Sequence, residues 1–203
     1  MGIIIITGTP GTGKTLIARA LAKKIWYKLI EIKKIVDEHK IDKKFCAHCK
    51  LSNLQYKDKG LYKIYKGERL VDLKRLKKAT MKKIRVLESK NIIIESHLTC
   101  EMRLPAQFVF VLRCAPDILK RRLQRRKYPK QKREENVLAE MLDYCTLLVR
   151  KNFKGKQIIE IDTSKRSINN CVREIINVIK GKKKKIDNVN YSKELEKFTK
   201  EVN

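Results

Sequence analysis

A glycine-rich segment near the N-terminus constrains the fold of this chain more than any other feature. Residues 8–15 read Gly-Thr-Pro-Gly-Thr-Gly-Lys-Thr, a complete G-x-x-x-x-G-K-[ST] motif directly after the apolar run 3–6. In this motif the backbone N–H groups surround phosphate oxygens, the lysine reaches the β- and γ-phosphates, and the last hydroxyl holds Mg²⁺. The sequence therefore predicts a strand, a phosphate loop and a helix in that order, with a site for a nucleoside triphosphate and Mg²⁺. The expected nucleotide contacts are Gly8, Gly11, Thr12, Gly13, Lys14, Thr15 and Leu16.

Strand-like and helix-like segments alternate along the rest of the chain. Strands are expected at 3–7, 27–32, 91–95, 107–113 and 157–162, and helices at 14–24, 73–89, 117–126, 137–149 and 168–180. Two of the strands are continuously apolar, as buried parallel strands are. The alternation predicts an α/β P-loop NTPase with a five-stranded parallel sheet flanked by helices, and a ligand at the carboxyl ends of the strands.

The chain is expected to form one domain over 1–181, followed by a basic tail over 182–203. Between two core elements, residues 33–73 are charged and include a patchy strand-like segment at 61–71, so they are expected to form a substrate-binding excursion. The polar stretch 127–135 is expected to be a loop. Residues 191–202 of the tail are expected to be either a detached amphipathic helix or a frayed end.

The charge of the chain is far from balanced. Fifty Lys and Arg face 22 Asp and Glu, which gives a formal net charge of +28. This excess favours a polyanionic partner beyond one nucleotide, with RNA or a ribonucleoprotein first. The alternative is a proteome rich in lysine, such as that of a thermophile or an AT-rich genome.

The apolar stretches and the cysteines indicate where in the cell the protein is expected. No stretch reaches the roughly 18–20 apolar residues of a membrane span, and the first strand begins without a signal peptide, so we expect a cytoplasmic protein. The cysteines are expected to be reduced thiols, four of them in or near the core: Cys100, Cys114, Cys145 and Cys171. Cys46 and Cys49 would supply half of a tetrahedral zinc site, which His39 or a partner subunit would complete, but plain thiols or a redox pair are favoured.

Three polar residues beside predicted strands are candidates for chemistry. Glu95 ends a buried-type strand, so its carboxylate is expected beside the phosphate loop, where it would accept a Mg²⁺-bound water or polarise an attacking water; the alternative is a cap of the next turn. His97 follows two residues later and is either catalytic or a hydrogen-bonded structural residue. Asp72 would contact an acceptor nucleotide or cap the following helix, and the cap is favoured.

Taken in order, these motifs identify a resemblance. The chain resembles the P-loop nucleoside monophosphate kinases, most of all the adenylate kinase isoenzyme 6 type and its archaeal counterparts, over about residues 2–180. The resemblance depends on residues 6–15, on Arg69-Leu70-Val71-Asp72, on residues 93–98, on Phe110-Val111-Leu112-Arg113, on residues 122–128 and on Glu135-Asn136.

The resemblance implies an activity and partners. It implies phosphoryl transfer from ATP to a nucleoside monophosphate, with AMP as the acceptor that gives two ADP, and ATPase activity. It also implies a part in small ribosomal subunit and 16S-type rRNA maturation through a ribosomal protein S11-type partner, and a monomer without membrane attachment. Eukaryotic members of the family often carry Asp where this chain has Glu95, and residues 45–59 look like an insertion in the acceptor-binding part.

The resemblance also implies site roles. His97 would orient the nucleophile, and residues 126–136 would be a short lid without zinc ligands. Arg126 is the first choice for the lid contact with the transferring phosphate, and Arg122 is the second. The alternative for these arginines is a solvated basic face or an RNA contact.

Several function classes compete. A nucleoside monophosphate kinase and a ribosome-assembly ATPase switch without significant kinase activity share one active site, so the sequence leaves both open, and a small-metabolite kinase also stays open. A Ras-like GTPase would carry an Asn-Lys-x-Asp motif, which the chain lacks. A motor of the AAA type would need a larger module.

Overall fold

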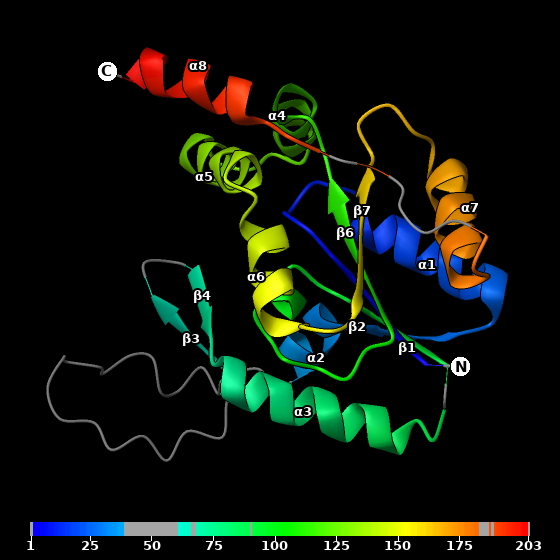
Figure 1. Ribbon diagram of the computed structural model, residues 1–203. Helices are drawn as coiled ribbons and strands as arrows, with labels where there is room; N and C mark the ends of the chain where they lie inside the picture. Colours follow the sequence, from blue (N-terminus) through cyan, green and yellow to red (C-terminus); the bar gives the residue numbers. More distant parts are fainter. Residues whose placement is uncertain are drawn as a thin grey trace, which may run out of the picture.

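The protein is built around a parallel five-stranded sheet (Figure 1). The computed structural model describes residues 2–38, 61–65, 68–89, 91–182, 187 and 189–202. The sheet comprises β1 (Ile3–Thr7), β2 (Lys28–Glu31), β5 (Ile92–Glu95), β6 (Phe108–Arg113) and β7 (Gln157–Asp162), in the order β2-β5-β1-β6-β7. In the central strand, Ile5 pairs with Ile94 on one side and Val109 on the other. The predicted five-stranded parallel sheet is confirmed.

Helices cover both faces of the sheet. α1 (Lys14–Ile25) and α7 (Ile168–Ile179) lie on one face, and α2 (Ile32–Glu38), α3 (Leu73–Val86) and α6 (Tyr144–Asn152) lie on the other (Figure 1). Successive side chains of a strand point to opposite faces, so Ile4 and Ile6 pack toward α1 and α7 while Ile5 packs in the opposite cluster. The strands are apolar on both sides because both sides are covered. This explains the continuous apolar runs in the sequence.

A third cluster joins the C-terminal segment to two helices above the sheet. It is formed by α4 (Pro116–Arg125), α5 (Lys130–Met141) and α8 (Ser192–Val202), which lie together in Figure 1. Tyr191 is buried in this cluster, and Leu195 and Phe198 pack against it. The helix expected as one alternative over 191–202 is therefore present, but it is not detached, because its apolar side chains find a partner surface on α5.

The region predicted as a loop over 127–135 is also different. α5 begins at Lys130, directly after Pro129, and its polar residues bond within the helix: Gln131 donates to Glu135 at 2.9 Å. Polar composition alone suggested a loop, but a one-turn spacing of hydrogen-bonding side chains supports a helix equally well. The single helix predicted over 137–149 is in fact the end of α5 and the start of α6. They are separated at Asp143, whose φ is 54°.

Between β2 and α3, the sequence predicted the strand-like segment at 61–71, which forms two strands, but it did not predict the helix α2. α2 follows β2 without a gap, and β3 (Tyr62–Tyr65) and β4 (Glu68–Val71) pair as an antiparallel hairpin. Asp72 caps α3, since its carboxylate accepts from the Lys74 and Arg75 N–H groups, which confirms the favoured reading. The insertion at 45–59, with the Cys46–Cys49 pair, lies outside the described residues, as does His39. Within the described ranges, no helix is long and apolar enough to cross a membrane.

Candidate active site

The phosphate loop connects β1 to α1 at the carboxyl edge of the sheet, as predicted. Two of its positions require glycine. A Cβ on Gly8, whose φ is 137°, would lie 2.3 Å from the Leu112 carbonyl oxygen, which is closer than any real contact. Gly13, with a φ of 95°, takes a left-handed conformation immediately before α1. The loop therefore packs against β6, and its last glycine leads into the N-terminus of α1, where backbone N–H groups favour an anion.

Lys14 holds its ammonium group over this loop. Its side chain is buried, and Nζ donates to the Thr9 carbonyl oxygen at 3.0 Å. Burial lowers the pKa of Lys14 from its usual value, and the nearby Glu95 carboxylate acts in the opposite direction. A desolvated cation at this place gains strongly from an incoming phosphate, because the interaction forms in a medium of low dielectric constant.

Glu95 and Thr15 lie together on the other side of the loop. Glu95 ends β5 beside Ile6 of β1 and is buried. Burial raises the pKa of Glu95, while Lys14 and a hydrogen bond with the Thr15 side chain lower it. A carboxylate and a hydroxyl are oxygen ligands of the kind Mg²⁺ takes, with phosphate and water completing its shell. The two residues predicted to hold the metal therefore fit that ion. In the part of the chain that the structure describes, no cluster of three or more His, Cys, Asp or Glu offers an all-protein metal cage.

Glu31 is a carboxylate that sequence reasoning missed. It ends β2 and pairs in register with Glu95 on the neighbouring strand. Arg19 Nε and Lys34 Nζ lie 2.6 and 2.9 Å from its oxygens, and the hydrogen bond from Arg19 lowers the pKa of Glu31 despite its burial. The negative charge of Glu31 contributes to the raised pKa of Glu95. The sequence did contain a signal for Glu31, because it ends a predicted strand and the carboxyl ends of parallel strands meet at one edge of the sheet.

His97 lies just beyond β5 at the mouth of the site. His97 is exposed, but protein atoms around its ring disfavour the charged form. This desolvation, followed by the positive charges of Lys14 and Lys132, lowers the pKa of His97 to about 4. Lys132 belongs to α5, so one flank of His97 is set by the region predicted as the lid. The imidazole is therefore neutral at neutral pH and has a nitrogen free to accept a hydrogen bond.

A cavity of about 340 Å³ opens beside the loop. It brings together Gly11, Thr12, Gly13 and Leu16 with Arg122 and Arg126, all of which the sequence predicted as nucleotide contacts. The remaining lining residues were not predicted in this role and are Ile17, Arg125, Thr163, Arg166, Ile168 and Cys171.

The loop after β7 closes this cavity and binds α4. Arg122 Nη2 donates to the Thr163 carbonyl oxygen at 2.7 Å, and the Thr163 hydroxyl lies 2.9 Å from the Thr12 carbonyl oxygen. Asp187 holds Arg166 through two hydrogen bonds of 2.6 and 2.8 Å. Arg122 is thus already engaged by protein groups, whereas Arg126 is exposed at the C-terminal end of α4.

A buried ionic network connects the phosphate loop to α5. Arg113, at the end of β6, binds Glu140 of α5 at 2.7 Å and Glu160 of β7 at 2.9 Å. Glu140 accepts a short hydrogen bond from the Thr9 hydroxyl of the loop. Burial would lower the pKa of Arg113, but the carboxylates of Glu140 and Asp143 outweigh it and raise the pKa above its usual value. The loop, β6 and α5 are therefore held as one unit.

Comparison with known proteins places the chain. A family model described as "AAA domain" matches residues 4–143. A protein named "Putative adenylate kinase" from Methanocaldococcus jannaschii is 36% identical over 90% of this chain and 88% of its own length. The chain belongs to the archaeal adenylate-kinase-like family of P-loop proteins. A second member with the same name, from Pyrococcus abyssi, is 33% identical over 94% of this chain and 91% of its own.

The fold of this adenylate-kinase-like chain extends to more distant proteins. A solved shikimate kinase from Acinetobacter baumannii, in complex with shikimate, superposes with a TM-score of 0.55 at 15% identity, over 90% of this chain and 95% of that one. At this identity the likeness concerns the fold alone. The residues that match the "AAA domain" model run from β1 to α5. A motor of the AAA type would need a larger module than this, so the match does not make the chain such a motor.

The adenylate-kinase-like core contains two polar residues whose sequence signal was weak. Arg113 ended an apolar strand, and Glu140 stood among apolar residues of a helix. Each is a charged residue at a position where burial is expected. A buried charge needs a partner, so the two could have been paired in principle. Nothing in the spacing showed that they meet, because 27 residues separate them.

Proposed function

We propose that the chain is an ATP-dependent nucleoside monophosphate kinase that converts ATP and AMP to two ADP, with ATPase activity. The observation that supports this most is the arrangement around Lys14. A buried ammonium group lies over a glycine loop, with the Glu95–Thr15 oxygen pair on one side and a cavity lined by arginines on the other. Phosphoryl transfer depends mainly on alignment and charge neutralisation, and this set supplies both.

The residues divide the work as follows. The loop N–H groups and Lys14 bind the β- and γ-phosphates of ATP, and Thr15 and Glu95 hold Mg²⁺. When bound, the ion supplies further neutralisation of charge on the transferring group. His97, neutral at neutral pH, accepts a hydrogen bond from the attacking oxygen and orients it.

The arginines of α4 have different tasks in this proposal. Arg122 is bound to the Thr163 carbonyl oxygen, so it positions the loop after β7 against the phosphate loop. Arg126 is exposed at the end of α4 and lines the cavity. It is therefore the cation that contacts the transferring phosphate when the turn between α4 and α5 closes over it.

The test measures ADP formation from purified protein and Mg-ATP, with and without AMP, CMP, UMP and GMP. A kinase is accelerated by one monophosphate and converts it to the diphosphate. Slow hydrolysis that ignores every monophosphate would replace the kinase with an ATPase switch. A protein with no turnover above a Lys14→Met control would contradict both.

A matched pair of arginine variants tests the proposed lid contact. Arg126→Ala is expected to lower kcat about 10²-fold or more, because one donor to developing negative charge is typically worth that much. Arg121→Ala is the control, since this side chain is 67% exposed and pairs with Asp117 on the same helix. Equal effects of the two substitutions would show that the basic face of α4 acts only through its general charge.

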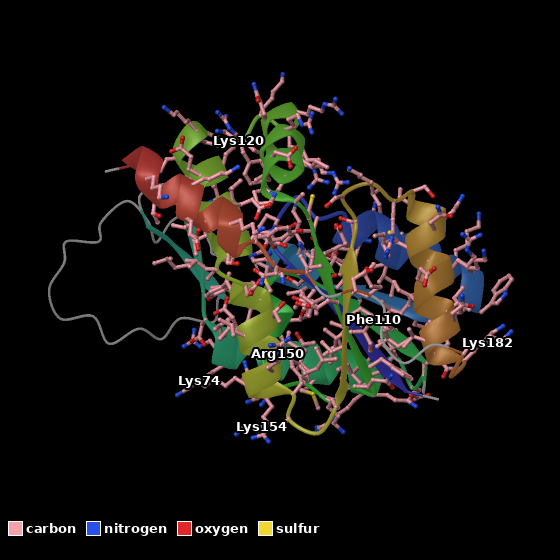
Figure 2. The ribbon with its side chains drawn as sticks, turned by 45° about the horizontal axis from the view of Figure 1, so that its top comes forward. Lys74, Phe110, Lys120, Arg150, Lys154 and Lys182 are labelled. Atoms are coloured by element: carbon pink, nitrogen blue, oxygen red, sulfur yellow. The ribbon has the colours of Figure 1, made fainter. Side chains whose placement is uncertain are left out.

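The charge distribution favours a second candidate, an assembly ATPase that works on a ribonucleoprotein such as the small ribosomal subunit, with an S11-type protein and rRNA as partners. Lys74, Lys120, Arg150, Lys154 and Lys182 are exposed, and Figure 2 shows them spread over the molecule. In addition to this general positive charge of the surface, one aromatic residue is prominent. Trp26 follows α1, is 91% exposed and is close in sequence to the exposed lysines Lys23, Lys24 and Lys28. Lysines with an exposed aromatic ring are typical of surfaces that bind single-stranded nucleic acid.

Trp26 provides the test of this candidate, because it is the only tryptophan of the chain. Titration with single-stranded RNA should quench its fluorescence, and the affinity should fall steeply as salt rises. Trp26→Ala should weaken binding about 5- to 100-fold, which corresponds to one stacked base. If Trp26→Ala leaves the RNA affinity unchanged, the interaction depends on charge alone. If the protein does not bind RNA at low salt, RNA is not its partner.

A further inference from the structure

Two buried cysteines face each other beside the phosphate loop. Cys100 lies in the short 3₁₀ helix η2 (Leu98–Cys100), which follows β5, and Cys145 lies in the first turn of α6. Their sulfur atoms are 3.8 Å apart. Cys100 is fully buried and Cys145 is 6% exposed. The other two cysteines of the described segments, Cys114 and Cys171, belong to separate clusters.

The pair lies against the two segments that carry the proposed catalytic groups. Cys100 Sγ donates to the His97 carbonyl oxygen at 3.0 Å. Cys145 has a hydrogen-bond interaction with the Thr9 side chain, and its charge interacts with that of Lys14. The two thiols thus connect the segment that carries His97 with the loop that carries Lys14. A change in either sulfur is transmitted to both.

The two thiols differ in reactivity. When Cys145 is a thiolate, the single S–H proton of Cys100 turns from the His97 carbonyl oxygen to the Cys145 sulfur, and this hydrogen bond, followed by the positive charge of Lys14, lowers the pKa of Cys145 against the effect of burial. The same interaction and burial raise the pKa of Cys100. The thiolate is the nucleophilic form, so Cys145, which also has the residual access to solvent, is the sulfur that reacts first.

We propose that Cys100 and Cys145 are an oxidative modification site, at which a peroxide forms a reversible intrachain disulfide that blocks the nucleotide site. The Cys145 thiolate attacks one peroxide oxygen, the O–O bond breaks, and the leaving hydroxide takes up a proton to become water. Cys100 then attacks the sulfenic sulfur of Cys145, the S–O bond breaks, and a second water leaves with the thiol proton. Overall, two thiols are oxidised and one peroxide is reduced to two waters.

The distance between the two sulfur atoms allows the disulfide to form, and its formation changes the groups next to the pair. A disulfide needs sulfur atoms about 2.05 Å apart, so the pair has to approach by roughly 1.8 Å. The approach draws the first turn of α6 and η2 together, and it replaces the Cys145 sulfhydryl that interacts with the Thr9 side chain. It also removes the Cys100 proton that is donated to the His97 carbonyl oxygen. The loss of turnover that follows rests on the proposed function, whereas the disulfide itself does not.

Mass spectrometry of the full chain tests the disulfide without any activity. A Cys46→Ser/Cys49→Ser background removes the other close pair in the sequence. After hydrogen peroxide treatment, alkylation under denaturing conditions and trypsin digestion, Cys100 falls in the peptide 91–103 and Cys145 in the peptide 134–150, each with one cysteine. We expect these peptides linked, with two hydrogens lost, and separated by dithiothreitol. Cys145→Ala and Cys100→Ala should each abolish the link, and Cys171→Ser should retain it. Full alkylation of both cysteines after peroxide would overturn the proposal.

Nucleotide binding is measured on the same oxidised and reduced samples. We expect the affinity for a fluorescent ATP analogue to fall at least tenfold on oxidation and to return with dithiothreitol. Oxidised Cys145→Ala should keep the affinity of its reduced form. A disulfide that leaves nucleotide affinity unchanged would overturn the blocking role. Failure of the kinase assignment is distinguishable, because reduced protein would then bind nucleotide without phosphorylating any monophosphate.

Discussion

Arg113 and Arg121 lie on consecutive elements, β6 and α4, in opposite environments. Arg113 is 2% exposed and forms ion pairs with Glu140, Asp143 and Glu160. Arg121 is 67% exposed and pairs with Asp117, itself 71% exposed, on the same helix. A buried, fully bonded charge fixes the relative positions of the elements that hold it, while an exposed pair contributes little to stability and mainly adds to the field of the surface. At the carboxyl edge of the sheet, the buried charge of Arg113 therefore fixes how β6, β7 and α5 lie relative to one another.

The largest effect is expected from Lys14→Met, which removes the buried cation at the loop. We expect turnover to fall about 10²- to 10³-fold, the usual effect of losing a group that stabilises developing charge. Stability should not fall, because burial lowers the pKa of Lys14 and so disfavours its charged form in the folded state. ADP formation and urea unfolding together check this. Loss of stability alongside loss of turnover would mean that Lys14 holds the loop together rather than binding phosphate.

Arg113→Met tests the buried side of the comparison by removing the shared partner of three carboxylates. We expect the free energy of unfolding to fall by about 3–5 kcal/mol, because buried negative charges are left unpaired. Arg121→Ala should change it by about 1 kcal/mol or less. Urea denaturation of both variants provides the measurement. A similar small change in the two would show that water reaches the network and that burial does not set its strength.

The comparison also explains which features could be predicted from the sequence. The loop over 8–15, the sheet and the buried cysteines follow from local patterns, since one motif or one periodicity carries each of them. The Arg113–Glu140 pair does not, because nothing local signals a contact between a strand end and a distant helix. The first part of α5, over 130–136, was missed since its polar residues bond to one another within the helix. The docking of α8 was missed since its apolar residues needed a surface that only the fold provides.

His97 sharpens the comparison, because its protonation is disfavoured first by the surrounding protein and then by the positive charges of Lys14 and Lys132. Its folded-state pKa of about 4 lies below the usual 6.5. Below pH 6.5 the unfolded chain takes up a proton on His97 that the folded protein does not accept until about pH 4. His97 should therefore lower stability as pH falls through this window and have no effect above it. The difference in unfolding free energy between wild type and His97→Gln, measured in EDTA from pH 7.5 to 4, reports this contribution. A difference that is independent of pH would contradict the lowered pKa.

The smallest effect is expected from Tyr191→Phe, which asks whether the C-terminal segment belongs to the buried network. The Tyr191 ring is 6% exposed and lies 5.2 Å from Arg113 Cζ, measured to the ring centroid. Its hydroxyl has no hydrogen-bond partner among the described residues.

Phenylalanine keeps the ring over the guanidinium and removes a buried polar atom, so stability should rise by about 1 kcal/mol. Tyr191→Leu is the matched variant, because it keeps an apolar side chain but loses the cation–π contact, and it should be less stable than Tyr191→Phe by about 0.5–2 kcal/mol. Urea midpoints of the three proteins decide the order. If Tyr191→Phe is instead less stable than wild type, the hydroxyl is hydrogen-bonded to water, and the C-terminal segment seals the network less tightly than its burial indicates.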